Sequence, residues 1–172
     1  MVKRVDLKKG EYNSYYQSYI YKSGDLDLID GLRVNLEAFM SFYSSIPDEK
    51  LAYRYADGKW TIKEIIQHLI DSERIFAYRA LRIARHDQMD LPGFDQDAYV
   101  PHSNANDRSI SQLKEEYEIL RRSTILLFES LSNDDLLRLG KASGSPVTPR
   151  AIGFIIIGHE NHHRQIIEER YL

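Results

Sequence analysis

The residues with the clearest potential for chemistry form the string GHENHH at positions 158–163. In a helix, His159 and His163 would share one face with their Cβ atoms about 5–6 Å apart, because residues four apart are neighbours on a helix surface. Two imidazoles at that separation can bind one divalent cation at Zn–N distances of roughly 2.0–2.1 Å. The spacing therefore indicates a metal site, and the alternative is a histidine pair that is simply packed.

The same string matches the H-E-x-x-H pattern of zinc proteases. Those enzymes take a third ligand downstream, whereas the residues printed after His163 offer only Glu168 and Glu169 on the same helix. We therefore expect the third ligand to come from an earlier part of the chain. The candidate is His68, because His86 and His102 lie at or in a long connection and His68 alone lies within another long helix.

Composition bounds the class of protein. A chain of 172 residues with 42% hydrophobic and 28% charged residues is typical of one globular domain, which we expect to span 1–172. The net charge is −3 and the basic residues are dispersed, so we expect no nucleic-acid partner. No apolar run approaches the roughly 18 residues of a membrane span, and the N-terminus lacks a signal-peptide pattern. With no cysteine either, we expect a cytoplasmic protein without disulfides, membrane contact or a protein thiol nucleophile.

Four amphipathic helices are predicted to position the histidines. Apolar residues at helical spacing place them at about 26–45, 60–85, 110–131 and 149–171. Thr61 and Glu64 form a capping box at the start of the second helix, and Thr148 precedes a proline at the first position of the fourth. His159 and His163 replace apolar residues on the buried stripe of the fourth helix, while His68 lies at the edge of the stripe on the second.

The remaining segments read as connections. Residues 86–107 form a long connection, rich in proline, asparagine and aspartate, that could cover one end of a bundle. Tyrosines near 12–19 recur at helical spacing, so we expect a short N-terminal helix or extended segment whose rings pack on the body of the protein. Residues 132–139 should add a turn or two, residues 140–147 should be a flexible surface segment, and no β-strand is predicted.

The sequence therefore predicts an all-α fold, an up-down-type four-helix bundle with a long connection between helices 2 and 3. Bundle cores commonly build metal sites from side chains on facing helices. Three neutral imidazoles would leave a coordination position open, which is typical of catalytic rather than structural sites. Gly158 costs helix stability, and its small size could let a neighbouring helix or a ligand approach.

Three segments, 58–71, 91–97 and 158–165, contain GKWTIKEIIQHLID, LPGFDQD and GHENHHRQ. In this order they resemble the DinB-like proteins, a family of YfiT-type metal-dependent hydrolases, over nearly the whole chain. The resemblance implies an up-down four-helix bundle. It also implies that the metal ligands are His68 on the second helix and His159 and His163 on the fourth. The family name describes expression and implies no DNA binding.

Residues beside the ligands are candidates for catalytic roles. Glu160 holds the place of a zincin base, but it projects about 100° away from His159 around the helix, which favours a carboxylate on the surface or behind the ligand. His162 lies angularly close to the ligand face. It is a candidate for donating a hydrogen bond to a ligand residue or for shuttling a proton near neutral pH. The alternative is that it packs partly exposed.

Several aspartates could also serve the site. Asp71, one turn after the histidine of the second helix, could orient that imidazole or pair with Arg74 or Arg79. Asp95 and Asp97 on the long connection are candidate general bases. Their positions favour turn-forming and capping roles.

Three functions fit such a site. The first is a metal-dependent hydrolase in which Zn²⁺ or Ni²⁺ activates water and polarises a carbonyl; imidazole alone does not select the metal. The second is a metal-dependent S-transferase that activates a low-molecular-weight thiol, because the three histidines and the bundle also resemble bacillithiol- and mycothiol-dependent enzymes. The third is a non-catalytic metal-binding bundle that forms a homodimer. The first two require a small-molecule substrate that the sequence does not identify.

Overall fold

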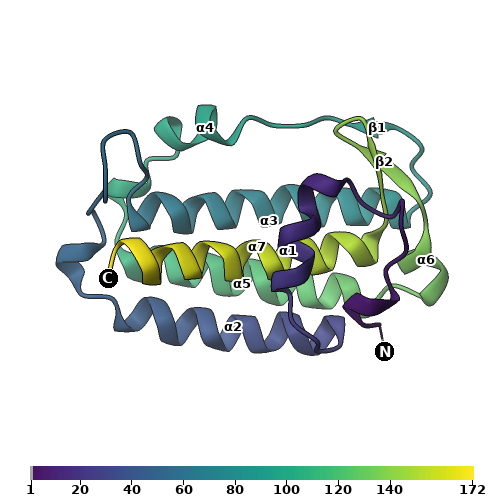
Figure 1. The fold of residues 1–172 in the computed structure, drawn as a ribbon, viewed down its shortest axis with the longest axis horizontal. Coiled ribbons are helices and arrows are strands. Elements are labelled where there is room, and N and C mark those ends of the chain that lie inside the picture. The colour runs from purple at the N-terminus through teal and green to yellow at the C-terminus, as the bar shows by residue number, and fades with distance from the viewer. Residues whose placement is uncertain (1) are drawn as a thin grey trace.

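Local signals fix where the four long helices begin. The residue before each helix, namely Asp27, Thr61, Ser109 and Thr148, accepts a backbone N–H from the first turn, which satisfies a group that the helix leaves unpaired. The helices are α2 (Leu28–Ser45), α3 (Ile62–Ala84), α5 (Ile110–Glu129) and α7 (Pro149–Arg170). The structure, a computed structural model that describes residues 2–172, arranges them as a four-helix bundle (Figure 1). The predicted fold class is confirmed.

Shorter helical segments connect and flank the bundle. They are α1 (Gln17–Lys22), α4 (Gln96–Tyr99), α6 (Asn133–Leu137) and the 3₁₀ turns η1 (Arg4–Asp6), η2 (Ser14–Tyr16), η3 (Asp48–Lys50), η4 (Val100–His102) and η5 (Ala105–Asp107). The segments α4, η4 and η5 all lie in the long connection, and each is only three or four residues long. Much of 86–107 outside them is irregular, as predicted. Asp95 caps α4 by accepting the backbone N–H groups of Asp97 and Ala98.

The long connection sets the directions of the helices. It runs back along the bundle above α3, so α5 begins at the same end as α3 and the two helices are parallel (Figure 1). Side-chain pairs follow this direction, since Gln67 of α3 contacts Arg108 just before α5, and Glu73 contacts Arg121 further along. The interface between α3 and α7 is antiparallel.

Helices α2 and α7 are also parallel. Leu28 packs over Gly153 near the start of both helices, and Asn35 donates to the carbonyl of Ile157 and the side chain of Asn161 one to two turns later. The order of directions is therefore up, down, down, up, so the predicted up-down alternation does not hold between α3 and α5, because the long connection returns along the bundle (Figure 1). Each helix has one parallel and one antiparallel neighbour.

A small sheet corrects the prediction that the chain lacks strands and that 140–147 is flexible. Strands β1 (Asp90–Leu91), β2 (Gly140–Ala142) and β3 (Ser145–Val147) lie in the order β1-β2-β3, parallel between the first two and antiparallel between the last two. Each strand is too short to show alternation in the sequence. The two residues that join β2 and β3, Ser143 and Gly144, both adopt positive φ, as a two-residue hairpin turn requires.

The N-terminal segment crosses the bundle. Helix α1 lies across α7 at a steep angle (Figure 1), which confirms the predicted short helix. The crossing occurs at Gly158, where an added Cβ would lie 1.7 Å from the carbonyl oxygen of Tyr19. Only glycine at position 158 permits the Tyr19 carbonyl to lie this close to α7.

A second contact holds the N-terminal segment ahead of α1. Glu11 accepts hydrogen bonds from Arg150 (2.7 Å) and Thr148 (2.9 Å) at the start of α7.

The apolar faces of the helices meet in two buried clusters. On α7, the apolar side chains between Ala151 and Ile157 belong to one cluster, whereas Ile167, together with Tyr171 just after the helix, belongs to the other. His159 and His163 fall between them. Within residues 2–172, no helix combines the length and the apolar character needed to cross a membrane.

Candidate metal centre

Three imidazoles from two helices converge in the bundle. The Nε2 atom of His159 lies 3.0 Å from Nε2 of His68 on α3 and 3.1 Å from Nε2 of His163 one turn along α7. One nitrogen from each of the three rings lies within 4.8 Å of the others. The predicted meeting of His68 with the pair on α7 is therefore observed.

Burial keeps these imidazoles neutral. His68 and His159 are 4% and 5% exposed, and His163 is half-buried. Burial lowers the pKa of His68 to about 4. Burial, followed by the proximity of the other histidines, lowers the pKa values of His159 and His163 well below the usual range. Only the neutral ring can bind a metal, so the environment favours the ligating form.

The arrangement fits a metal ion. Two imidazole nitrogens bonded to one zinc at about 2.0–2.1 Å each are at most about 4.2 Å from one another. The Nε2–Nε2 distances of 3.0 and 3.1 Å from His159 are within this limit. Nε2 of His159 faces two other ring nitrogens, and one N–H cannot satisfy both of them. A shared cation would satisfy all three lone pairs. Among residues 2–172, these three form the one group of histidine and carboxylate side chains with such a separation.

Ser72, not Asp71, lies next to the Nδ1 side of the His68 ring. The hydroxyl of Ser72 lies 3.4 Å from Nδ1 of His68. Asp71 instead accepts from Gln67 at 3.0 Å and lies 3.8 Å from Arg74, so its pairing with arginine is the reading that the geometry supports. Burial raises the pKa of Asp71 against the opposing effect of Gln67. The sequence could have indicated Ser72, since it lies one turn after His68.

Glu160 is neither a surface residue nor directed at the histidines. It is 4% exposed and accepts from Arg121 at 2.6 Å and from the hydroxyl of Tyr117. Arg121 also donates to both oxygens of Glu73 on α3, at 2.9 and 2.8 Å. Burial raises the pKa of Glu160, while Arg121 and Tyr117 act in the opposite direction. The group contains two carboxylates and one guanidinium, and it lies directly behind His159 in a small cavity that His159 also lines.

His162 packs at the edge of the site. It is half-buried, and its ring centroid lies 5.2 Å from those of Tyr19 and His163. Burial lowers its pKa, and the charge of Lys22 adds to this effect. The ring of Tyr19 also lies 5.2 Å from that of His159, so α1 covers one side of the histidine group.

Two cavities flank the histidines. One of about 380 Å³ borders His159, and one of about 210 Å³ borders His163. Gln96 of α4 lines both. The segment 94–97 therefore lies over the junction between the cavities, a placement that agrees with α4 lying above α3 in Figure 1. This position was not apparent from the sequence, which shows where the connection lies in the chain and not which part of it reaches the site.

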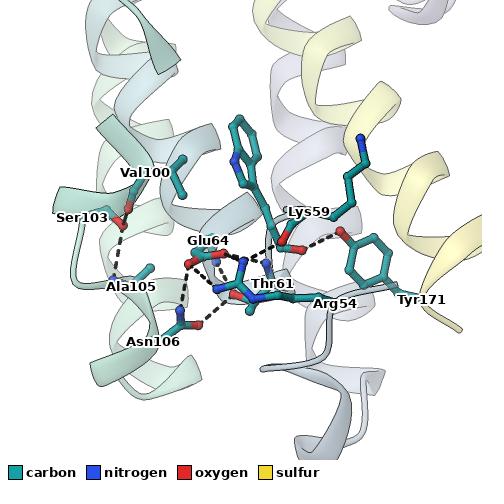
Figure 2. A network of polar contacts seen from close by, with 10 residues as sticks. Arg54, Lys59, Thr61, Glu64, Val100, Ser103, Ala105, Asn106 and Tyr171 are labelled. Carbon is teal, nitrogen blue, oxygen red and sulfur yellow. Dashed lines mark hydrogen bonds and ion pairs between the residues drawn. The ribbon is translucent and has the colours of Figure 1, made fainter. Parts of the chain in front are cut away.

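A polar network fixes the residues that lead into α3. Figure 2 shows Glu64 at its centre, where it accepts from Arg54 and Asn106, both at 2.9 Å. The hydroxyl of Tyr171 donates to the carbonyl of Trp60 at 2.6 Å. The Trp60 ring lies 4.8 Å from His68. The network therefore holds an aromatic wall beside the histidines and joins it to the end of the long connection.

The bundle and its buried histidine group define a class of protein, a four-helix bundle with a candidate metal centre between two antiparallel helices. Residues 32–167 match the sequence model described as the DinB superfamily, and all three histidines lie within the matched region. The chain belongs to the DinB superfamily.

Solved structures share the fold. YfiT from Bacillus subtilis, described as a probable metal-dependent hydrolase with an unusual four-helix bundle topology, matches with a TM-score of 0.69 and 16% identity over 95% of this chain and 90% of its own. The DinB-like protein YjoA from Bacillus subtilis matches with a TM-score of 0.58 and 18% identity, over 83% of this chain and 87% of its own. At these identities the likeness concerns the fold.

A curated relative is similar over a shorter region. The protein named "Putative metal-dependent hydrolase OB0413" of Oceanobacillus iheyensis is 31% identical over 64 residues. The aligned part covers 37% of this chain and 36% of the relative, so the match spans about a third of either protein.

Proposed function

We propose that this protein is a divalent-metal-dependent hydrolase whose metal is held by His68, His159 and His163. The observation that carries the proposal is the convergence of three Nε2 atoms, at 3.0 and 3.1 Å, from two helices distant in the sequence. The printed descriptions of YfiT and OB0413 as hydrolases support the reaction class. We propose Zn²⁺ or Ni²⁺, since both suit imidazole ligands.

The protein groups divide into those that hold the metal and those that shape access to it. A divalent ion bound here would lower the pKa of a water toward 7 and polarise a substrate oxygen. Ser72 and Trp60 restrict the orientation of the His68 ring by contact. The cavities beside His159 and His163 give a small molecule two ways to approach the ligand nitrogens, and Gln96 offers amide groups to both.

Elemental analysis of the purified protein tests metal binding. We expect about one zinc or nickel ion per chain, as a single three-histidine site allows, and a loss of most of it in His159→Ala. His102→Ala is the matched control, because this histidine is exposed and lies on η4 in the long connection. Equal metal content in His159→Ala and the unaltered protein would rule out the site.

Activity of the metal-loaded protein tests the reaction class. We expect release of p-nitrophenol from p-nitrophenyl esters that depends on the metal and is lost in His159→Ala. A parallel assay adds a low-molecular-weight thiol such as cysteine and an alkylating acceptor. Conjugation without ester hydrolysis would assign the S-transferase instead, and a metal-loaded protein inert in both assays would favour a non-catalytic role.

A further inference from the structure

The cavity beside His159 has a wall that the metal site does not require. Its volume is about 380 Å³, and it lies between the N-terminal segment, α3 and the long connection. Aromatic side chains form most of this chamber, which is lined by Tyr15, Tyr16, Tyr19, Phe76, Phe94 and His159. The remaining lining residues are Ser72, Asp95 and Gln96. Four separate parts of the fold, the N-terminal segment, α3, the long connection and α7, therefore supply aromatic rings to one space.

The aromatic rings that line the chamber contact one another edge to face. Tyr15 meets Tyr16 edge to face at 5.1 Å and Tyr19 at 6.4 Å, and Tyr16 meets Phe76 at 6.0 Å. Tyr16 and Tyr19 are half-buried, whereas Tyr15 is 68% exposed. We expected these tyrosines to pack on the body of the protein, and Tyr16 and Tyr19 do so. Packing does not explain why the ring of Tyr15 is held at the surface beside a cavity.

Without a metal at the histidines, the side chains that line the chamber offer no positive charge to a ligand, and Asp95 is the one charged group among them. Arg79 lies beside the chamber, where its guanidinium is 5.8 Å from the centroid of the Phe76 ring and opposes the rise that burial causes in the pKa of Tyr16. This guanidinium donates to the carbonyl of Pro92 and the hydroxyl of Ser143. An anionic group in the chamber would meet a carboxylate and aromatic faces, which carry negative partial charge.

We propose that this chamber binds an uncharged aromatic group of a small molecule. Flat rings suit the space, because edge-to-face and offset contacts with tyrosine and phenylalanine add to the gain from burial. Ser72 and Gln96 can hydrogen-bond a neutral polar substituent. The binding site stands on its own residues, whereas its use as a substrate subsite, with the polar end of the ligand directed at His159, rests on the proposed function.

Binding of benzamide, followed by NMR or calorimetry on the purified protein, tests the site. We expect saturable binding that Tyr15→Ala and Phe94→Ala each weaken about three- to tenfold, the range of one aromatic contact. Tyr21→Ala is the matched control, since Tyr21 is 64% exposed on α1, similar to Tyr15, and does not line the chamber. Its affinity should equal that of the unaltered protein.

Charge selectivity is measured on chelator-treated protein, where the carboxylate of benzoate cannot bond to a metal. We expect benzoate to bind about fivefold more weakly than benzamide, because the exposed Asp95 repels its carboxylate with an energy of about 1 kcal/mol. Equal binding of the two probes would overturn the inference, as would benzamide affinity unchanged by Tyr15→Ala and Phe94→Ala.

The metal content of the same samples separates this inference from the proposed function. Benzamide binding in a protein that takes up no zinc or nickel would support the chamber and contradict the hydrolase. Metal uptake without benzamide binding would do the reverse.

Discussion

Arg121 joins three helices behind the histidines. This residue of α5 is 1% exposed and pairs with Glu73 of α3 and Glu160 of α7. Its guanidinium also lies over the ring of Tyr117, 5.1 Å from the centroid. Because Glu160 follows His159 directly, the ion pairs fix the turn of α7 that carries a ligand. The arrangement sets the separation of α3 and α7 across which the imidazoles meet.

Replacing Arg121 with leucine should destabilise the protein by about 3–5 kcal/mol, because two buried carboxylates lose their partner. The neighbouring Arg122→Leu removes a pair with Glu118 in which Arg122 is 65% exposed, and such exposed helix pairs contribute only about 0.3–0.5 kcal/mol. Urea unfolding of both variants measures the difference. A similar small loss for the two would show that Arg121 is not the link between the helices.

Residue types and spacing predicted which histidines meet but not their surroundings. The spacing of His159 and His163 on an apolar stripe indicates a shared face, His68 is the histidine within another long helix, and the family resemblance implies the same three residues. The partners of Glu160 could not be predicted, because Arg121 lies on a helix whose rotation relative to α7 is set by packing. From the sequence of α7 alone, Glu160 is expected at the periphery, whereas the packing of α5 against α7 makes it part of a buried ion-pair group.

Among the elements, α1 depends on a single backbone approach. It lies against α7 where Gly158 leaves room for the carbonyl of Tyr19, and it carries tyrosines to the histidines. Gly153 of the same helix is also closely approached, but there an added Cβ would meet the end of the Leu28 side chain at 2.6 Å. A side chain can rotate away, whereas a backbone carbonyl moves only with its helix.

Gly158→Ala should therefore displace α1, while Gly153→Ala should leave it in place at some cost in packing. Amide hydrogen exchange of residues 17–22 measures the effect directly. We expect protection in α1 to be lost in the first variant and retained in the second. If α1 stays protected in Gly158→Ala, the close approach does not hold it.

The small sheet shows the limit of sequence patterns at this scale. Helices of 18 to 23 residues repeat their apolar positions often enough to be recognised. Strands of two or three residues do not, and β1 pairs with β2 from about fifty positions away in the chain. The Ser143-Gly144 turn was the one local signal of the hairpin.

At the scale of the whole molecule, the four helices were predicted, but their directions differ from the predicted up-down alternation between α3 and α5 (Figure 1). Each amphipathic stripe shows that a helix is packed and leaves its neighbours undetermined. The connection 86–107 is long enough to return along the bundle, and this permits the parallel pair α3 and α5. Association with a second copy through an exposed helix face stays a prediction.

Acid should destabilise the metal-free molecule. The folded-state pKa of His68 is about 4, against about 6.5 in an unfolded chain. Between these values the unfolded state binds a proton that the folded state does not, so the free energy of unfolding falls as the pH decreases from 6.5 to 4. The free energy of unfolding is unaffected by protonation of this residue above pH 6.5, and the loss reaches about 3 kcal/mol at most once the pH is below 4.

Urea unfolding of chelator-treated protein across this range tests the prediction. His68→Leu should show a shallower decline with acid than the unaltered protein, while the exposed His102→Leu should match it. Parallel curves for all three proteins would mean that His68 titrates normally in the folded state.

The connection over the histidines is fastened at both ends. At one end β1 pairs with β2, and at the other Asn106 bonds to Thr61 and Glu64 at the start of α3. The span between these attachments, residues 92–105, contains the residues of the connection that line the two cavities, Phe94 to Asp97. Changes of sequence at these four positions would reshape the approach to the histidines without disturbing the long helices that carry them.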